Sequence, residues 1–185
     1  MDDVTDLIGK KVAFLATTGY EDSELTSPWN AVQLAGGTPV MVSPASDRIE
    51  GKNGHLQTVD LAAADADAND FDALVLPGGV VNADHLRMDA DAVAFAKDFF
   101  VQHKPVGAIC HAAWTLIEAE VVEGRTLTSY PSLKTDLRNA GATWVDEEVV
   151  VDEGLVSSRT PDDLPAFNAK LVEEIAEGKH SGQTA

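Results

Sequence analysis

The sequence predicts an α/β protein with a flavodoxin-like, doubly wound, mostly parallel sheet sandwiched by helices. Short and almost continuously apolar runs, such as residues 11–16, are typical of strands buried on both faces of a sheet. Segments with helical spacing alternate with these runs along the chain. The 185 residues make one ordinary domain's length, and no repeat or linker divides them. We therefore expect a single domain, with a core over about residues 10–177 and polar tails at 1–9 and 178–185.

The elements follow from apolar spacing and from turn residues. Central strands are predicted at residues 11–16, 38–43, 71–76 and 105–109. Helices are predicted at residues 21–34, 89–102, 112–119 and 132–139. Gly51 and Gly54 indicate one hairpin, residues 149–156 indicate another, and a short strand is expected near Thr126. The last helix should begin at residues 160–163, where Thr160 offers a capping hydroxyl ahead of a proline and two acids.

Charge and cysteine content exclude several classes of function. The chain has 31 Asp and Glu against 13 Lys and Arg, a net charge of −18, so we do not expect the basic face that binding to nucleic acids and anionic membranes requires. The sequence shows no signal peptide and no apolar run long enough to span a membrane, so we expect a cytoplasmic protein. The single cysteine, Cys110, excludes an internal disulfide.

Neither a metal nor another cofactor is expected from the sequence patterns. The histidines are scattered without the spacing of metal ligands, and a thiolate cluster is impossible with one cysteine. Neither a P-loop nor a Gly-x-Gly-x-x-Gly motif is present, so nucleotide binding has no support.

Ligands of open α/β sheets bind beyond the carboxyl ends of the strands, which directs attention to the loops 17–22, 77–87 and 110–113. Cys110 lies where a strand must turn sharply into a helix, the geometry of a nucleophile elbow. We expect a positive φ at this residue and a thiol pKa lowered by the helix dipole. The alternative is that Cys110 is a buried residue that fills space.

Four other groups complete the candidate site. His111 could meet the sulfur of Cys110 where the elbow backbone is irregular, or it could be a surface histidine. Glu21 could be an ordinary acid at a helix start, or its carboxyl could donate a proton to the sulfur. Gly78 and Gly79 could form a turn, or they could bring backbone N–H groups close to a bound oxyanion.

Five segments in the same order resemble the PfpI family of intracellular cysteine proteases, in the ThiJ/PfpI group of the class I glutamine amidotransferase-like superfamily. The resemblance covers roughly residues 10–177. The segments that carry it are Tyr20-Glu21-Asp22-Ser23-Glu24-Leu25, Leu74-Val75-Leu76-Pro77-Gly78-Gly79, Ala108-Ile109-Cys110-His111, Thr128-Ser129-Tyr130-Pro131 and Val156-Ser157-Ser158-Arg159.

The resemblance implies a site and an assembly as well as the fold. It implies a nucleophile at Cys110, a proton shuttle at His111 and a carboxyl at Glu21 that contacts the sulfur. It further implies a homodimer or larger homo-oligomer, in which an acid of the adjoining subunit orients the histidine. Asp84 is the nearest match to that acid, in a loop one residue longer than the family pattern.

Three functional hypotheses follow. The first is a stress-response cysteine hydrolase, with peptidase, glyoxalase or deglycase activity on peptides, aldehydes or glycated proteins. The second is an oxidative-stress sensor whose Cys110 is oxidised to sulfenic or sulfinic acid, which is the form expected without a resolving cysteine. The third is a holdase chaperone. The physiological substrate is not determined by the residue pattern.

Overall fold

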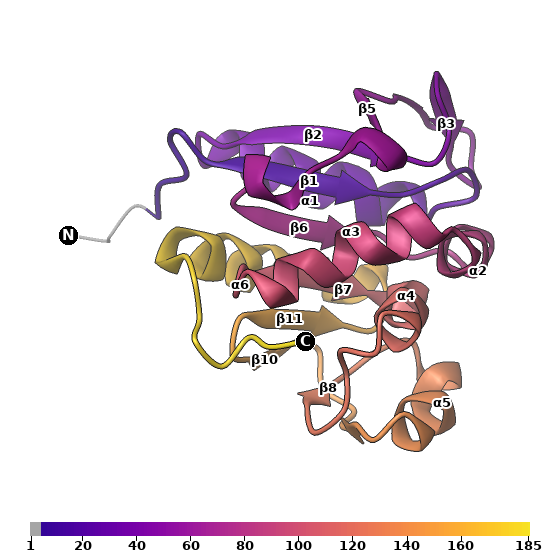
Figure 1. Ribbon diagram of the computed structural model, residues 1–185, viewed down its shortest axis with the longest axis vertical. Helices are drawn as coiled ribbons and strands as arrows, with labels where there is room; N and C mark the ends of the chain where they lie inside the picture. The colour runs from indigo at the N-terminus through magenta and orange to yellow at the C-terminus, as the bar shows by residue number, and fades with distance from the viewer. Residues whose placement is uncertain (1–4) are drawn as a thin grey trace.

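The computed structural model describes residues 5–185 and confirms the predicted α/β class. Within this range, seven strands form one sheet in the order β10-β11-β7-β6-β1-β2-β5 (Figure 1). Six of them run parallel, and β10 is antiparallel to β11 at one edge. The sheet strands are β1 (Lys11–Leu15), β2 (Thr38–Ser43), β5 (Leu61–Ala62), β6 (Ala73–Leu76), β7 (Val106–Ile109), β10 (Val150–Asp152) and β11 (Leu155–Ser158).

Helices cover both faces of this sheet, as the uninterrupted burial of strands such as β6 requires. One face packs against α2 (Val80–Met88), α3 (Ala90–Val101) and α4 (Ala113–Glu118), with Phe95 and Phe99 fully or almost fully buried. The other face packs against α1 (Asp22–Leu34) and α6 (Leu164–Glu177), where Phe167 and Leu171 are buried. Figure 1 shows the sheet between these two layers.

Smaller elements extend this core. The hairpin predicted around Gly51 and Gly54 forms from β3 (Arg48–Glu50) and β4 (Leu56–Thr58). The strand expected near Thr126 is β8 (Thr126–Leu127), which pairs in parallel with β9 (Thr143–Trp144). The remaining short helices are η1 (Ala63–Asp65), η2 (Ala68–Asp70), η3 (Cys110–Ala112), η4 (Pro131–Leu133), α5 (Lys134–Asn139) and η5 (Pro161–Asp163).

Two local predictions are wrong for identifiable reasons. The segment 77–87, predicted as a loop, forms α2 from Val80 onward because Leu86 and Ala83 bury one face of a helix that Gly79 starts at φ 94°. Thr160 makes no side-chain cap. Asp163 secures that turn instead, and its carboxylate accepts hydrogen bonds from Arg159 N and Nε, both at 2.9 Å.

The C-terminal residues 178–185 lie on the body of the protein. Gln183 is fully buried and donates from Nε2 to the Lys104 carbonyl at 3.1 Å. Residues 1–4 of the predicted N-terminal tail lie outside the described range. None of the helices within residues 5–185 is both long and apolar enough to cross a membrane.

Candidate active site

Cys110 lies at the carboxyl end of β7, where the chain turns into η3. Its φ is 63°, the positive value predicted for a nucleophile elbow, and its side chain is 8 % exposed. Its carbonyl accepts a hydrogen bond from Tyr130 N at 3.1 Å, which ties the elbow to a later segment of the chain. The backbone therefore presents the sulfur at the sheet edge where ligands of this fold bind.

His111 meets the sulfur as predicted, because the residue before it has a left-handed backbone. Its Nδ1 lies 3.1 Å from Cys110 Sγ. Tyr130 stacks on the imidazole with the ring centroids 4.6 Å apart, and Ser132 Oγ lies 3.4 Å from Nε2. Burial lowers the pKa of His111, and the positive charge of Lys52 lowers it further, so the imidazole is neutral at neutral pH. A neutral imidazole beside a thiol can act as a general base.

The carboxyl beside the sulfur belongs to Glu24, whereas the sequence pattern predicted Glu21. Glu24 is fully buried in α1, and its Oε2 accepts a hydrogen bond from Gly78 N at 2.9 Å. Its Oε1 is buried and has no hydrogen-bond partner among residues 5–185. Burial and the charge of Glu21 raise the pKa of Glu24 to about 8, and the hydrogen bond from the Gly78 N–H acts in the opposite direction. Glu24 is therefore a carboxylic acid at neutral pH.

Glu21 lies one helical turn earlier and faces the mouth of the site. Its carboxylate forms an ion pair with Lys52 Nζ. The hairpin that carries Lys52 is fixed by Asp22, whose carboxylate accepts hydrogen bonds from Asn53 N at 2.9 Å and His55 N at 2.8 Å. Residues three apart on a helix share a face, so Glu21 and Glu24 look alike in the sequence. Burial distinguishes the two residues, because the side chain of Glu24 is buried and that of Glu21 pairs with Lys52.

The pKa of the thiol differs from the sequence expectation. Burial raises the pKa of Cys110 to about 12, and the charge that Glu24 carries when ionised raises it as well. The backbone N–H groups of Gly79 and His111 lower the pKa of the same thiol but do not compensate. The helix effect is weak because η3 is a single turn and α4 has six residues. Cys110 is thus a protonated thiol at neutral pH.

Gly78 and Gly79 have different roles in the loop after β6. The N–H of Gly78 is used by Glu24, so it is not free to stabilise an oxyanion. The N–H of Gly79 faces the sulfur. Asn82 holds this loop: its Nδ2 donates to the carbonyls of Pro77 and Gly78, both at 3.0 Å, and its Oδ1 accepts from Thr17 N at 2.7 Å. The N–H groups of Gly79 and His111 therefore both face the sulfur, whereas the N–H of Gly78 does not.

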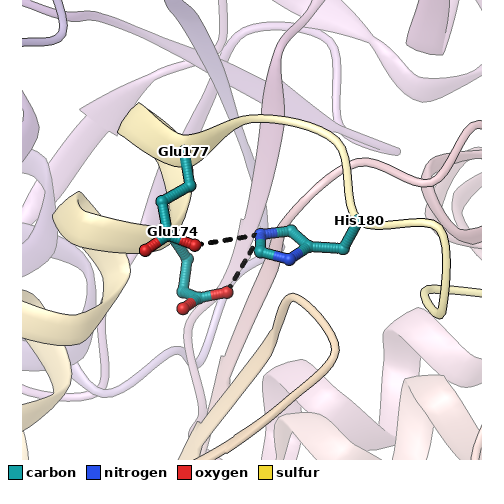
Figure 2. A group of neighbouring side chains, drawn as sticks. All are labelled: Glu174, Glu177 and His180. Carbon is teal, nitrogen blue, oxygen red and sulfur yellow. Dashed lines mark ion pairs between the residues drawn. The ribbon is translucent and has the colours of Figure 1, made fainter.

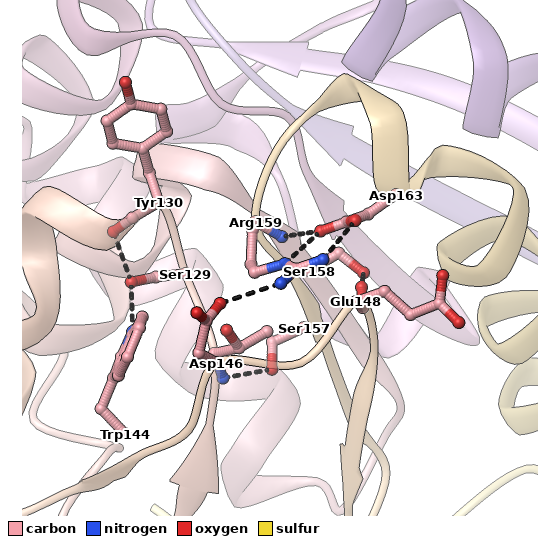
Figure 3. Close-up of polar contacts among 10 residues, drawn as sticks. Ser129, Tyr130, Trp144, Asp146, Glu148, Ser157, Ser158, Arg159 and Asp163 are labelled. Carbon is pink, nitrogen blue, oxygen red and sulfur yellow. Dashed lines mark hydrogen bonds and ion pairs between the residues drawn. The ribbon is translucent and has the colours of Figure 1, made fainter.

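The segments 128–131 and 156–159 form a polar network that positions Tyr130 (Figure 3). Ser129 Oγ accepts from Trp144 Nε1 at 3.0 Å and donates to the Tyr130 carbonyl at 2.9 Å. Thr128 N donates to Ser157 Oγ at 3.0 Å, which joins the two segments. Both segments carry the resemblance noted in the sequence: Ser129 contacts the backbone of Tyr130, whose ring stacks on His111, whereas Arg159 pairs with Asp146 and Asp163.

Asp84 lies on the exposed side of α2. No hydrogen bond or ion pair joins it to His111 within the part of the chain that the structure describes, where Cys110 and Ser132 face the imidazole nitrogens. A role for Asp84 therefore requires a second subunit.

A pocket of about 540 Å³ opens onto the sulfur. Glu21, Glu24 and Lys52 line it together with Cys110 and His111, as do the exposed side chains of Val80 and Val81. Sequence patterns alone do not single out Glu24, Tyr130 or Ser132. The helical period links Glu24 to Glu21, and Tyr130 lies inside a motif that the sequence did show.

We expect Glu24 to make the folded protein less stable as the pH rises from about 5 to 8. The folded carboxyl keeps its proton up to about pH 8, whereas the ordinary value is 4.5, so the folded state binds the extra proton and loses that advantage as the pH increases. One pKa unit corresponds to about 1.4 kcal/mol, so the loss should amount to a few kcal/mol. Urea unfolding of wild type and Glu24→Gln over this range measures it.

The Glu24→Gln variant should show a flatter pH dependence than wild type, and Glu173→Gln, which changes an exposed carboxylate on α6, should follow wild type. Equal slopes for wild type and Glu24→Gln would contradict the protonated state assigned to Glu24.

Together, the doubly wound sheet and the buried Cys–His pair on its strand-to-helix elbow define an α/β protein of the cysteine-elbow class. Residues 10–174 match the DJ-1/PfpI family, and the chain belongs to that family. The resemblance that the sequence motifs indicated is thereby confirmed.

Relatives and solved structures agree with this assignment. The chain is 46 % identical over 166 residues to the Bacillus subtilis protein named "Putative cysteine protease YraA", covering 89 % of this chain and 98 % of the relative. It is 46 % identical over 168 residues to General stress protein 18 of the same organism, covering 89 % and 97 %. Among solved structures, Drosophila melanogaster DJ-1beta superposes with a TM-score of 0.85 at 26 % identity, covering 91 % of each chain.

A two-domain protein from Anabaena variabilis, with DJ-1/ThiJ/PfpI-like and ferritin-like domains, has a TM-score of 0.88 at 33 % identity. The match covers 95 % of this chain and 50 % of that one, so this chain spans half the length of the two-domain protein.

Proposed function

We propose that this protein is a stress-response cysteine hydrolase in which Cys110 attacks the carbonyl carbon of an aldehyde, a peptide or a glycated protein. The observation that carries the proposal is the 3.1 Å contact between Cys110 Sγ and His111 Nδ1 at a buried elbow. The names of the two Bacillus subtilis relatives, "Putative cysteine protease YraA" and "General stress protein 18", support the same function.

The proposed reaction begins with proton transfer from the thiol to neutral His111. The thiolate then attacks the carbonyl carbon, and the N–H groups of Gly79 and His111 stabilise the oxyanion that develops. Protonated Glu24 matters because a second negative charge beside the sulfur would oppose formation of the thiolate. With a peptide or a glycated protein, His111 returns its proton to the leaving nitrogen, and water then hydrolyses the thioester. An oxo-aldehyde has no leaving group: its hemithioacetal would lose the C–H proton to His111 and regain a proton at the neighbouring carbonyl carbon, which gives a thioester that water hydrolyses to a hydroxy acid.

The pocket favours a substrate that is small or that has an extended shape. The pocket has room for about 540 Å³, and its mouth is framed by the Glu21–Lys52 ion pair and by apolar Val80 and Val81. Such a site suits a small oxo-aldehyde or one segment of a peptide.

We also propose a homodimer or larger homo-oligomer in which Asp84 of one subunit orients His111 of another. Val80 and Val81 are about half exposed beside the pocket, and exposed apolar groups of this kind mark surfaces between proteins. Asp84 lies on the same helix. The cytoplasm stays the expected location.

A panel of substrates tests the proposed hydrolase. Chelator-treated protein is assayed with methylglyoxal, a glycated peptide and fluorogenic peptides, and turnover of at least one class is expected. Stoichiometric alkylation of Cys110 should abolish that turnover. Full activity of the alkylated protein would refute the proposal.

A second candidate function is redox sensing, favoured by the protonated state of Glu24 and by its Oε1, which has no hydrogen-bond partner within residues 5–185. A carboxylic acid beside the sulfur can donate a hydrogen bond to a sulfinate oxygen and so stabilise that oxidation state. Peroxide would oxidise Cys110 in two steps, each adding one oxygen to sulfur and releasing water.

We expect mild peroxide to add two oxygen atoms to Cys110, with the reaction stopping at the sulfinate. Glu24→Leu removes the donor, so the modified protein should pass on to the sulfonate or stay at the sulfenate. Glu21→Gln is the matched control, because it changes the neighbouring carboxyl that does not reach the sulfur. Intact-mass spectrometry measures the products, and an identical distribution in all three proteins would oppose the redox reading.

A further inference from the structure

Glu174, Glu177 and His180 converge at the end of α6 (Figure 2). His180 N donates to the carbonyl of His103, which precedes β7, whereas Cys110 follows β7, so the group lies at the other end of that strand. One carboxylate oxygen of each glutamate and one imidazole nitrogen all lie within 4.8 Å of one another. The glutamates are three residues apart and share a helix face, and His180 follows the turn at Gly178 that ends the helix.

The contact between Glu174 and His180 is close but poorly aligned. Glu174 Oε2 lies 3.1 Å from His180 Nε2, yet both atoms are buried without a hydrogen-bond partner among residues 5–185. Glu174 is 6 % exposed. A buried carboxylate oxygen without a hydrogen bond is costly, so the ion pair leaves both atoms in need of a further partner, which a bound cation would supply.

The distances suit a small divalent cation. Four ligands at about 2.0–2.1 Å from Zn²⁺ in a tetrahedron are about 3.3 Å from one another. His180 Nε2 lies 3.1 Å from Glu174 Oε2 and 3.9 Å from Glu177 Oε2, which brackets that separation. Glu177 is exposed, so water can take the fourth position.

We propose that Glu174, Glu177 and His180 bind a first-row transition-metal ion of the Zn²⁺ type, which joins the C-terminal residues to α6. One imidazole with two carboxylates favours such a metal, whereas Ca²⁺ and Mg²⁺ prefer a shell of oxygens. Residues 177 and 180 lie outside the match to the DJ-1/PfpI family, which ends at residue 174. The site is separate from Cys110 and independent of its chemistry.

Contacts with neighbouring residues fix the position of His180. His180 N donates to the His103 carbonyl at 2.9 Å, and the imidazole packs on Gly154, where an added Cβ would meet Cδ2 at 2.9 Å. Gln183 N donates to the His180 carbonyl at 3.0 Å. The imidazole is thus held in place before any metal arrives. The sequence pattern predicted no metal, because Glu-x-x-Glu-x-x-His is not a familiar zinc spacing.

Metal titration of the full chain tests the site. Chelator-treated protein is titrated calorimetrically with Zn²⁺, and with Co²⁺ as an optical probe. We expect one equivalent to bind at micromolar concentration or below, with a rise in Tm. Cys110→Ala should keep this equivalent, and the Co²⁺ spectrum should lack the thiolate band that binding at Cys110 would give.

Variants of the three ligands show where the Zn²⁺ ion binds. Loss of a ligand should weaken Zn²⁺ binding at least as much as loss of an outer-shell partner, which costs about 10- to 100-fold. We therefore expect that drop in His180→Ala and in Glu177→Gln, an exposed change that leaves the core intact, and no drop in the matched control Glu173→Gln. Unchanged binding in His180→Ala, or binding at millimolar Zn²⁺ only, would overturn the proposal.

Discussion

Cys110→Ala should lower kcat/KM by at least about 10³-fold on every substrate that the wild-type protein turns over. The thiol is the sole nucleophile of this type in the chain, and the pocket at the carboxyl edge of β7 ends on it. The remaining rate would come from the N–H groups of Gly79 and His111, which bind an oxyanion without a nucleophile. Steady-state kinetics on chelator-treated protein measures the effect.

The loss should reside in chemistry and leave folding intact. Alanine removes one sulfur atom and keeps the backbone, so urea unfolding should change little. His111→Ala should cost about 10²- to 10⁴-fold, and the double variant should be no worse than Cys110→Ala, because the base has no function without the thiol. His85→Gln, an exposed histidine on α2, is the control. Additive losses in the double variant would mean that His111 acts elsewhere.

The fold was predictable because its strands are buried on both faces and leave a strong pattern. Val106 to Ile109 is entirely buried, and so is β6, which makes each an apolar run that a sequence displays directly. Helix α2 was not predictable in the same way. Three of its apolar residues, Val80, Val81 and Met88, are exposed, and it starts at a glycine with φ 94°, so its residues resemble a loop until packing against α4 is seen.

The sequence predicts the Cys110–His111 contact of the candidate site, but it does not predict Glu24 as the buried carboxyl. Cys110 and His111 are adjacent in the chain, so the elbow alone brings them together. Glu24 is chosen over Glu21 by the position of Gly78 and by the lysine of a distant hairpin, both of which are tertiary facts. The thiol pKa was misjudged for the same reason, because burial outweighs a short helix. Sequence adjacency predicts which side chains meet at the elbow, but the pKa values of these groups depend on burial in the folded protein.

Gly78→Ala should lower the free energy of unfolding by more than about 3 kcal/mol, the largest effect on stability expected at this site. A Cβ at this position would lie 2.6 Å from Cys110 Cβ and 2.8 Å from the Ile109 carbonyl, and it would also overlap Glu24 Oε2. Two of these neighbours belong to the backbone or lie next to it, so they cannot move aside cheaply. The methyl group would also push the Glu24 carboxyl off the N–H of Gly78.

Gly54→Ala separates this crowding from backbone strain. Gly54 has φ 96° and nothing within 4 Å of an added Cβ, so its substitution costs conformational strain alone, about 1–2 kcal/mol. Glu24→Ala tests the assignment further, because removing the carboxyl leaves room for the methyl group. The double variant Gly78→Ala with Glu24→Ala should therefore be more stable than the sum of the two single changes predicts, with a coupling of about 1 kcal/mol or more in urea unfolding. Strict additivity would show that Gly78 is crowded by the backbone alone and that Glu24 does not fill the space between the glycine and the sulfur.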